Sequence, residues 1–354
     1  MSIEDNLYRF LKIYKKLPFV VKLTLGEIYK LFPKKLKYGQ FYYLYLTRIK
    51  NFNKNKTSTL LSHQLRLAIE NLSYYKDIKH KNLSEFPIIS KHLINNNFDC
   101  FLNHNNSNRI KANTGGSSGN PFEFYIEKGV SRPKEKAHFD WYWGFFGYKP
   151  GDKILMIRGE SLSDGRLYEY QPIENKLALS CYLLNAKNIE EALLKINKFN
   201  PKFIHAYPSA LKNFINLTTK AQLSLTIDIK TIFLGSEGLY NYDRELFVSY
   251  FKAKIAHWYG QSERLVHAGN CPFSNNLHIF PFYGYVELVD EQEKVITSPE
   301  VKGRIVATGF DNAVMPLIRY DTRDEAEYAT ETECRCGFKG KSFKIIHGRK
   351  QDYI

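Results

Sequence analysis

The sequence lacks an apolar run long enough to span a membrane. Its most apolar stretch, residues 17–32, is interrupted by Lys22, Glu27 and Lys30. The first twenty residues also lack the apolar core and the small-residue cleavage site of a secretory signal peptide. The five cysteines form an odd set without the spacing of a secreted disulfide framework. Together these absences predict a cytoplasmic protein in a reducing compartment.

Acidic residues are scarce relative to basic ones, above all near the N-terminus. The chain has 51 Lys and Arg against 36 Asp and Glu, a net charge of +15. Residues 1–56 contain 13 basic and 3 acidic residues, a net charge of +10, and apolar residues recur among them at roughly helical spacing. This pattern predicts a basic helical arm. The arm could rest on the inner membrane surface. Alternatively, its lysines could face solvent while the rest of the arm packs on the core of the protein.

No zinc finger, recognition helix or RNA-binding aromatic motif is present, so we expect no nucleic-acid partner.

The element pattern changes near residue 105. Residues 1–105 are mainly helical in pattern, with one helix expected from Gln64 to Tyr75 and capped by Ser62. Residues 106–347 alternate short apolar runs with helical stretches, which predicts an α/β core with largely parallel strands and a β-rich end. Strands are expected at 153–158, 203–207, 231–234, 254–258, 285–289 and 304–308, and helices at 189–199 (capped by Asn188), 208–219 and 242–251.

The stretch Thr-Gly-Gly-Ser-Ser-Gly-Asn-Pro at 114–121 is rich in glycine and hydroxyl groups. Its glycines free the backbone to bend, and its hydroxyls and amides can surround phosphate oxygens. No lysine follows the final glycine, so it is not a P-loop of the Walker type. Taken alone, such a stretch is more often an ordinary loop than a phosphate-binding one.

Four further motifs follow this loop in order: Gly-Ser-Glu at 235–237, Trp-Tyr-Gly-Gln-Ser-Glu at 258–263, Arg-Tyr-Asp-Thr-Arg-Asp at 319–324, and Gly-Arg-Lys-Gln-Asp at 348–352. With Ala-Tyr-Pro-Ser at 206–209 and Cys-Arg-Cys-Gly at 334–337, the chain resembles the adenylate-forming superfamily of acyl-CoA synthetases from about residue 60 onward. The likeness is to its phenylacetate–CoA ligase-like branch, which includes capsular polysaccharide biosynthesis proteins. The resemblance implies the large N-terminal α/β domain of such an enzyme, in which mixed and parallel sheets are flanked by helices and joined to a β-rich subdomain.

The resemblance also implies the roles of single residues. Glu263 would hold Mg²⁺, a cation that prefers carboxylate and phosphate oxygens, and would act in catalysis with Ser262 and Thr114. The β- and γ-phosphates of ATP would be bound by the loop residues Thr114, Gly115, Gly116, Ser117, Ser118 and Gly119. The adenine would be contacted by Gly235, Ser236, Glu237 and Tyr259, with Gly260 in the same motif as Tyr259. Ser262 would contact the α-phosphate, and Asp324 and Arg349 would contact the ribose.

Members of this superfamily continue into a smaller lid that carries a lysine for adenylation. Residues 348–354 would be the hinge to that lid, with Gln351 at the hinge position, and no segment after Ile354 corresponds to the lid. The chain is therefore expected to be either truncated or supplied with a lid from elsewhere. If it is truncated, we expect nucleotide binding with slow adenylation.

A structural zinc site is predicted from four separated residues. Cys334 and Cys336 supply two thiolates, and Cys271 and His278 lie seven residues apart. Four N and S ligands make a closed zinc site if the fold brings them together. His267 is an alternative to His278, and four unrelated residues are the other interpretation.

By the same resemblance, the acid pocket includes Tyr207 and Pro208, with aromatic residues 141–146 either lining it or packing as helix core. An aromatic or long apolar acid would fit such a lining.

The predicted function is an ATP-dependent, AMP-forming carboxylate ligase. It would pass the acyl group to CoA or an amine, in capsular or cell-surface polysaccharide synthesis. The alternatives are an aryl- or fatty acyl-CoA ligase, and a non-catalytic zinc-stabilised nucleotide-binding module.

Overall fold

The computed structural model describes residues 10–52, 55–79, 82–114, 122–159, 162 and 165–349. The chain divides into two compact units, each built from two stretches of sequence. Unit 1 comprises residues 1–40 and 139–257, and unit 2 comprises residues 41–138 and 258–354. Helix α4 (Lys34–Lys50), helix α7 (Ser131–Gly144) and strand β8 (Lys254–Gly260) each contain a boundary. The boundary in α4 adjoins Gly39, whose left-handed backbone (φ 75°) kinks the helix.

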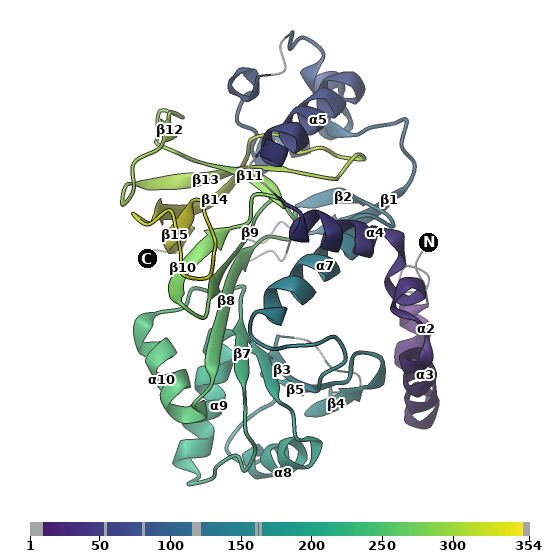
Figure 1. Cartoon of the computed structure of the whole chain (residues 1–354). Coiled ribbons are helices and arrows are strands. Elements are labelled where there is room, and N and C mark those ends of the chain that lie inside the picture. The colour runs from purple at the N-terminus through teal and green to yellow at the C-terminus, as the bar shows by residue number, and fades with distance from the viewer. Residues whose placement is uncertain are drawn as a thin grey trace. The chain divides into compact units, whose positions relative to one another are not determined.

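Unit 1 is built on a parallel sheet in the order β8-β7-β6-β3-β5, with β4 antiparallel at its edge (Figure 1). The central strands are almost entirely buried, and their sequences are accordingly runs of apolar residues without alternation. The strands are β3 (Ile154–Arg158), β4 (Tyr168–Gln171), β5 (Lys176–Ser180), β6 (Phe203–Ala206) and β7 (Thr231–Leu234), with the first half of β8.

Amphipathic helices cover this sheet. In α8 (Ile189–Phe199) the buried residues Ile189, Ala192 and Ile196 recur at helical spacing. Helix α9 (Pro208–Lys220) begins with a proline, which suits a first helical position. The remaining elements of this unit are α10 (Asn241–Phe251), the short helix η5 (Pro172–Glu174), α2 (Leu11–Lys16) and α3 (Phe19–Leu31).

Unit 2 contains an antiparallel sheet in the order β12-β11-β13-β14-β15-β10-β9, and the end of β8 pairs with β9. A separate hairpin pairs β1 (Arg109–Asn113) with β2 (Glu123–Glu127). The sheet strands are β9 (His267–Cys271), β10 (Ser274–Ile279), β11 (Gly284–Val289), β12 (Val295–Ile296), β13 (Lys302–Gly309), β14 (Tyr320–Tyr328) and β15 (Ser342–Arg349).

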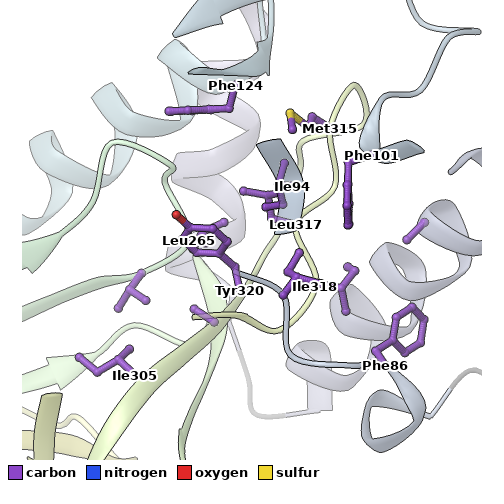
Figure 2. Packing of buried hydrophobic residues seen from close by; sticks show 14 of the residues in the cluster. Phe86, Ile94, Phe101, Phe124, Leu265, Ile305, Met315, Leu317, Ile318 and Tyr320 are labelled. Atoms are coloured by element: carbon purple, nitrogen blue, oxygen red, sulfur yellow. The ribbon is translucent and has the colours of Figure 1, made fainter. Parts of the chain in front are cut away.

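The core of unit 2 joins its helical segment to this sheet. Phe86, Ile94 and Phe101 from the helical segment pack with Ile305 and Leu317 (Figure 2). Aromatic and branched side chains fill the cluster, so it contributes a large buried apolar area. The helices are α5 (Asn55–Asn71), η1 (Ser73–Tyr75), η2 (Leu83–Glu85), α6 (Lys91–Asn96) and η3 (Phe98–Phe101).

The predicted fold class is confirmed, since helices precede an α/β region with parallel strands and an antiparallel, β-rich end. Two details were wrong. Helix α5 starts at Asn55, so Ser62 lies inside the helix rather than at its cap, and η1 replaces its expected last turn. Asn188 does stand at the start of α8, but its side chain bonds Asn185 and Leu183 instead of the helix amides. In the part of the chain that the structure describes, no helix is both long and apolar enough to cross a membrane.

Candidate functional site

The predicted phosphate loop connects the two strands of the β1–β2 hairpin, and its base is fixed by two hydrogen bonds. The Thr114 amide donates to the Phe122 carbonyl at 2.9 Å, and the Phe122 amide donates to the Thr114 hydroxyl at 3.0 Å. The Thr114 hydroxyl accepts in this pair, so its own proton stays available for an oxygen acceptor. Gly115, Gly116, Ser117, Ser118 and Gly119 lie outside the described residues.

Glu263, the predicted magnesium ligand, is half-buried and accepts a hydrogen bond from Tyr320 at 3.0 Å. The Tyr320 ring stacks on Phe122, with ring centroids 6.0 Å apart, so one aromatic pair links Glu263 to the base of the loop. Burial raises the pKa of the Glu263 carboxyl, while the Tyr320 hydroxyl and the Arg349 charge lower it. A carboxylate held in this way is a ready ligand for a hard cation.

Asp324, the predicted ribose ligand, lies between Tyr259 and Arg349. Tyr259 donates to Asp324 Oδ2 at 2.6 Å, and Arg349 Nε lies 3.5 Å from Oδ1. Asp324 and Arg349 are direct partners in the β14–β15 ladder, so sheet register places them together. Burial and the Asp324 charge raise the pKa of Tyr259 well above 10, so its hydroxyl stays protonated and donates. Since a carboxylate has about four acceptor positions, Asp324 can still accept from other hydroxyls.

In unit 1 the Gly-Ser-Glu motif follows β7, and Glu237 binds the start of α9. Its carboxylate accepts from the Ser209 amide at 2.9 Å and from the Ser209 hydroxyl at 2.8 Å. A carboxylate at this position accepts from a backbone amide of the first turn and is attracted to the positive, N-terminal end of the helix dipole. Glu237 therefore ties the end of β7 to the Tyr207-Pro208 turn of the predicted acid pocket.

A second polar group at the same strand ends is centred on Arg158, the last residue of β3. Its guanidinium donates to His205 Nε2 at 3.3 Å, to the Tyr207 hydroxyl at 3.3 Å and to the Ser236 hydroxyl at 3.2 Å. It also lies over the Tyr207 ring, 4.7 Å from the centroid. Burial and the Arg158 charge lower the pKa of His205 well below 6.5, so the imidazole is neutral and can accept.

The aromatic stretch 141–146 packs mainly as helix core. Tyr142 and Phe146 are buried, and the Trp143 ring stacks on Phe233 of β7 with centroids 4.2 Å apart. Trp143 also contacts the His205 ring edge-on at 5.2 Å. The stretch therefore borders the Arg158 group through Trp143, while Phe145 is exposed.

The four predicted zinc ligands come together in unit 2. The nearest ligand atoms are Cys271 Sγ and Cys334 Sγ, 3.6 Å apart, and Cys336 Sγ and His278 Nε2, 3.5 Å apart. All four ligand atoms lie within 4.8 Å of one another. For comparison, two sulfurs on a tetrahedral zinc are about 3.8 Å apart, given a Zn–S distance of about 2.3 Å. The alternative ligand, His267, instead packs against Phe280.

The surroundings of His278 suit a metal ligand. Its Nδ1 is 2.9 Å from the Ser342 hydroxyl, which leaves Nε2 toward the cysteines. Burial lowers the pKa of His278 to about 4, so the imidazole is neutral, as a ligand must be. The sulfur separation is far beyond the length of a disulfide bond.

The structure thus brings the predicted residues together in separate groups within each unit. Unit 2 holds Thr114, Glu263 with Tyr320, the Tyr259–Asp324–Arg349 group and the cysteine cluster. The exposed residues Gly260 and Ser262 precede Glu263, and no hydrogen bond to the Ser262 hydroxyl is seen among the described residues. Unit 1 holds Gly235, Ser236 and Glu237 with Tyr207 and Pro208.

Sequence reasoning missed Arg158, His205 and Tyr320. Arg158 and His205 each end or nearly end a predicted strand, and in a parallel sheet such positions converge at one edge. That convergence was the available signal for Arg158 and His205. Tyr320 lies inside a predicted motif, but nothing in its spacing points to Glu263.

No family model matches the chain. Protein CapK of Staphylococcus aureus is 23% identical over 367 residues, which covers 97% of this chain and 78% of CapK.

Crystal structures of 2-hydroxyisobutyryl-CoA ligase have a similar fold. The open conformation in complex with 2-HIB-AMP and CoA is 16% identical, with a TM-score of 0.64 over 82% of this chain and 73% of the ligase chain. The postadenylation state is 15% identical, with a TM-score of 0.66 over 86% and 70% of the two chains. The chain therefore shares the fold of 2-hydroxyisobutyryl-CoA ligase and is similar to CapK over almost its whole length, in line with the resemblance that the motifs indicated.

Proposed function

We propose that the protein is an ATP-dependent, AMP-forming carboxylate ligase. The observation that carries this proposal is the pair of carboxylate groups in unit 2, with Glu263 linked through Tyr320 to the base of the phosphate loop and Asp324 held by Tyr259 and Arg349. These are the positions that the motifs assign to the metal and to the ribose. The fold shared with 2-hydroxyisobutyryl-CoA ligase supports the same reaction class.

In the proposed reaction, an oxygen of the substrate carboxylate attacks the α-phosphorus of ATP. The new C–O–P bond forms, the bond from the α-phosphorus to the bridging oxygen breaks, and pyrophosphate leaves with that electron pair. No proton is transferred in this first step, so it needs alignment and charge neutralisation rather than a general base. In the second step the thiol of CoA or an amine attacks the acyl carbon, the bond from that carbon to the AMP oxygen breaks, AMP leaves with that electron pair, and the proton of the thiol or amine is lost to water.

The residues of this chain supply the alignment. Glu263 would hold a magnesium ion, which neutralises phosphate charge when bound. The hydroxyl of Thr114 and the amides of its loop would bind the outer phosphates, and Asp324 would accept from the ribose hydroxyls. The similarity to CapK supports an acid used in capsular or cell-surface polysaccharide synthesis.

The test is ligand-linked unfolding of the full chain. ATP with Mg²⁺, and AMP alone, are each added while the midpoint of thermal unfolding is followed. A ligand present at about 100 times its Kd, and bound by the native state alone, adds about 2.7 kcal/mol to the free energy of unfolding. We expect both nucleotides to stabilise the chain, since this readout needs binding but no lid. Absence of any shift at millimolar ATP and AMP would contradict the proposal and favour a binding module that takes another ligand.

We also propose that Cys271, His278, Cys334 and Cys336 hold a structural zinc ion. Three thiols and a neutral imidazole whose second nitrogen meets Ser342 form a closed four-ligand set that zinc prefers. The ion would fasten the β9–β10 hairpin to the turn at 334–337.

Metal analysis of the purified chain tests this assignment. We expect one equivalent of zinc per chain, lost in Cys334→Ser, and a lower unfolding temperature after chelation. Cys181→Ser, a change at a half-buried cysteine of unit 1, is the matched control and should keep the zinc. A metal-free protein that unfolds at the same temperature with and without added zinc would exclude the site.

Third, we propose that α3 contacts an anionic membrane surface. Three residues of α3 are buried against the protein, namely Lys22, which pairs with Glu169 at 3.2 Å, Gly26, which leaves room for Pro172, and Tyr29. A Cβ at Gly26 would lie 2.4 Å from the Pro172 Cβ. The outer side is mostly apolar, with Val20 and Leu31 at 71% and 84% exposure and Phe19, Val21, Leu23, Leu25, Ile28 and Phe32 also exposed beside Thr24 and the Glu27–Lys30 ion pair.

This arrangement reverses the usual amphipathic surface helix, which buries its apolar face in the protein. Lys30 in the last turn of α3 and the lysines that follow the helix, at positions 34, 35 and 37, supply the positive charge that favours anionic lipid over a neutral partner. Peripheral binding through an apolar helix face and nearby lysines would place the enzyme at the inner membrane surface.

Vesicle co-sedimentation tests the contact. We expect binding to vesicles that contain phosphatidylglycerol and little binding to pure phosphatidylcholine. Val20→Asp with Leu31→Asp should weaken it at least about tenfold, since each buried CH₂ contributes about 0.8 kcal/mol. Leu194→Asp, at an exposed leucine of α8, is the control. If the chain instead ignores vesicles and forms dimers that the α3 variant disrupts, the α3 face pairs with a second copy and the membrane proposal fails.

A further inference from the structure

The Arg158 group occupies the topological switch point of the unit 1 sheet. In chain order the parallel strands are β3, β5, β6, β7 and β8, but β3 lies between β5 and β6 in space. The chain leaves β3 toward one edge of the sheet and returns to build the other edge from β6 onward. In open α/β sheets, ligands bind outside the carboxyl ends of the strands at such a point. Arg158 ends β3, and His205 and Tyr207 lie at the end of β6 beside it.

Arg158 is bound by acceptors that carry no charge. Its three partners are a neutral imidazole and two hydroxyls, and no carboxylate of the described residues lies within ion-pair distance of it. Glu237, the acid at the neighbouring strand end, is committed to Ser209. Three of the five N–H donors of the guanidinium are used, so two stay available. The side chain is half-buried, which strengthens its attraction for an anion relative to a fully exposed cation.

Lys134 in unit 2 is a cation whose partners are of a different kind. It is 2% exposed, and it donates to the carbonyls of Tyr283 at 2.8 Å and Phe310 at 2.7 Å, with Asp311 at 4.0 Å. Its ammonium group therefore has backbone carbonyl acceptors and a carboxylate close by. Arg158 has neither feature, although its position is equally fixed by three hydrogen bonds and the Tyr207 ring.

We propose that Arg158 determines substrate specificity by binding a second anionic group on the carboxylic acid. The ligase would therefore use an acid that carries a further carboxylate or phosphate, rather than an aromatic or long apolar acid. This inference rests on the proposed function, since it places the acid beside the Tyr207-Pro208 turn. His205, Tyr207 and Ser236 are positioning residues that aim the guanidinium. The two remaining donors are Nε–H and one Nη1–H, so the guanidinium can donate to oxygens of such a group while keeping its three contacts.

The experiment compares acids of equal length. The full chain is titrated calorimetrically with succinate, glutarate and adipate, and with butyrate, pentanoate and hexanoate, in the absence and presence of a non-hydrolysable ATP analogue. We expect the best diacid to bind at least about tenfold more tightly than the monoacid of the same length, as a charge-assisted pair allows. In Arg158→Met this preference should vanish, while the affinity for monoacids and for the nucleotide analogue stays within about twofold.

Two variants control for side effects. Arg158→Lys keeps the charge without the fork and should retain part of the preference. Lys198→Met removes an exposed positive charge from α8 and should leave the preference unchanged. A phosphorylated acid, 3-phosphoglycerate, distinguishes a phosphate from a carboxylate as the second group.

Three results would overturn the proposal. An equal loss for monoacids and diacids in Arg158→Met means that the arginine holds the reacting carboxylate. A weaker nucleotide in the same variant assigns Arg158 to the phosphates, and a wild-type chain with no diacid preference leaves Arg158 a structural residue. The titrations without nucleotide separate this inference from the ligase proposal, because diacid preference can be present in a chain that binds no ATP.

Discussion

The charged groups at the strand ends of unit 1 and those of unit 2 have opposite characters. In unit 1 the central charge is Arg158, a cation whose partners are a neutral imidazole and two hydroxyls. In unit 2 the central charges are Glu263 and Asp324, anions that accept from tyrosine hydroxyls. The first group is suited to an anion and the second to a cation and to hydroxyl groups.

This difference separates two tasks of the proposed ligase. A site that joins an acid to ATP must recognise the acid and must also bind the metal and the sugar of the nucleotide. Under the proposals above, Arg158 would serve the first task, and Glu263 and Asp324 would serve the second. A variant of Arg158 should therefore change the acid preference, and variants of Glu263 and Asp324 should change nucleotide binding and the reaction rate. A variant that changed both the acid preference and nucleotide binding would contradict this division.

The largest effect is expected from Glu263→Gln. The change removes the negative charge that would hold Mg²⁺ while keeping the size of the side chain and one oxygen. We expect ATP- and acid-dependent hydroxamate formation with hydroxylamine to fall about 100-fold, since the loss of one preorganised electrostatic contact has that scale. The stabilisation by AMP alone should persist, because AMP binding does not require the metal.

Glu70→Gln, at an exposed glutamate of α5, controls for the loss of one negative charge from unit 2. A Glu263→Gln chain that shows normal hydroxamate formation but an altered acid preference would reverse the assignment of tasks. It would place Glu263 with the acid instead of the metal.

A smaller effect is expected from Asp324→Asn. Two charge-assisted hydrogen bonds to the ribose would become neutral ones, and Arg349 would lose its partner. We expect the affinities for ATP and for AMP to fall together, by about tenfold, while the diacid preference at Arg158 stays unchanged. Titration with both nucleotides checks this, with Asp77→Asn, at an exposed aspartate, as the control. If only ATP weakened, Asp324 would contact the phosphates or their metal rather than the sugar.

Part of this arrangement could be predicted from the sequence. Strand β7 and helix α8 were predicted to the residue, because buried strands are short apolar runs and the amphipathic pattern of α8 is regular. The four cysteine and histidine ligands were predicted as one set, because thiolates and imidazoles outside a disulfide framework point to metal. Asp324 and Arg349 belong to motifs far apart in sequence, and the β14–β15 register places them side by side.

The rest depends on long-range geometry. Arg158 is an unremarkable residue at the end of a strand, and only the parallel register brings it to His205, Tyr207 and Ser236. The helical spacing of apolar residues in residues 1–56 predicted a basic helical arm but not which side of a helix would face the protein. Lys22 faces inward because it pairs with Glu169, and Gly26 faces inward because only a glycine leaves room for Pro172. Neither contact could be predicted from the sequence pattern.

The smallest effect is expected from Tyr320→Phe, and it is a shift along the pH axis. Burial raises the pKa of Glu263, and the hydrogen bond from Tyr320 opposes that rise. Without the hydroxyl, the pKa of Glu263 should rise further. Because a metal binds the carboxylate form, stabilisation by Mg²⁺ and ATP is present above the pKa of Glu263 and is lost as the pH falls through it. The variant should lose that stabilisation at a higher pH than the wild type.

The ligand-free chain provides a check of sign for the same group. A carboxyl whose pKa is raised by folding binds more protons in the native state, so its contribution to stability falls as the pH rises from 4.5 through the folded pKa. Ligand-free stability and metal-dependent stabilisation should therefore change in opposite directions over one pH window, and Tyr320→Phe should move both. Tyr285→Phe, at a half-buried tyrosine of β11, should move neither. If Tyr320→Phe left the pH dependence of both ligand-free stability and metal-dependent stabilisation unchanged, the Tyr320 hydroxyl would not affect the pKa of Glu263. Only Asp324 and its partners would then remain as a supported carboxylate group in unit 2.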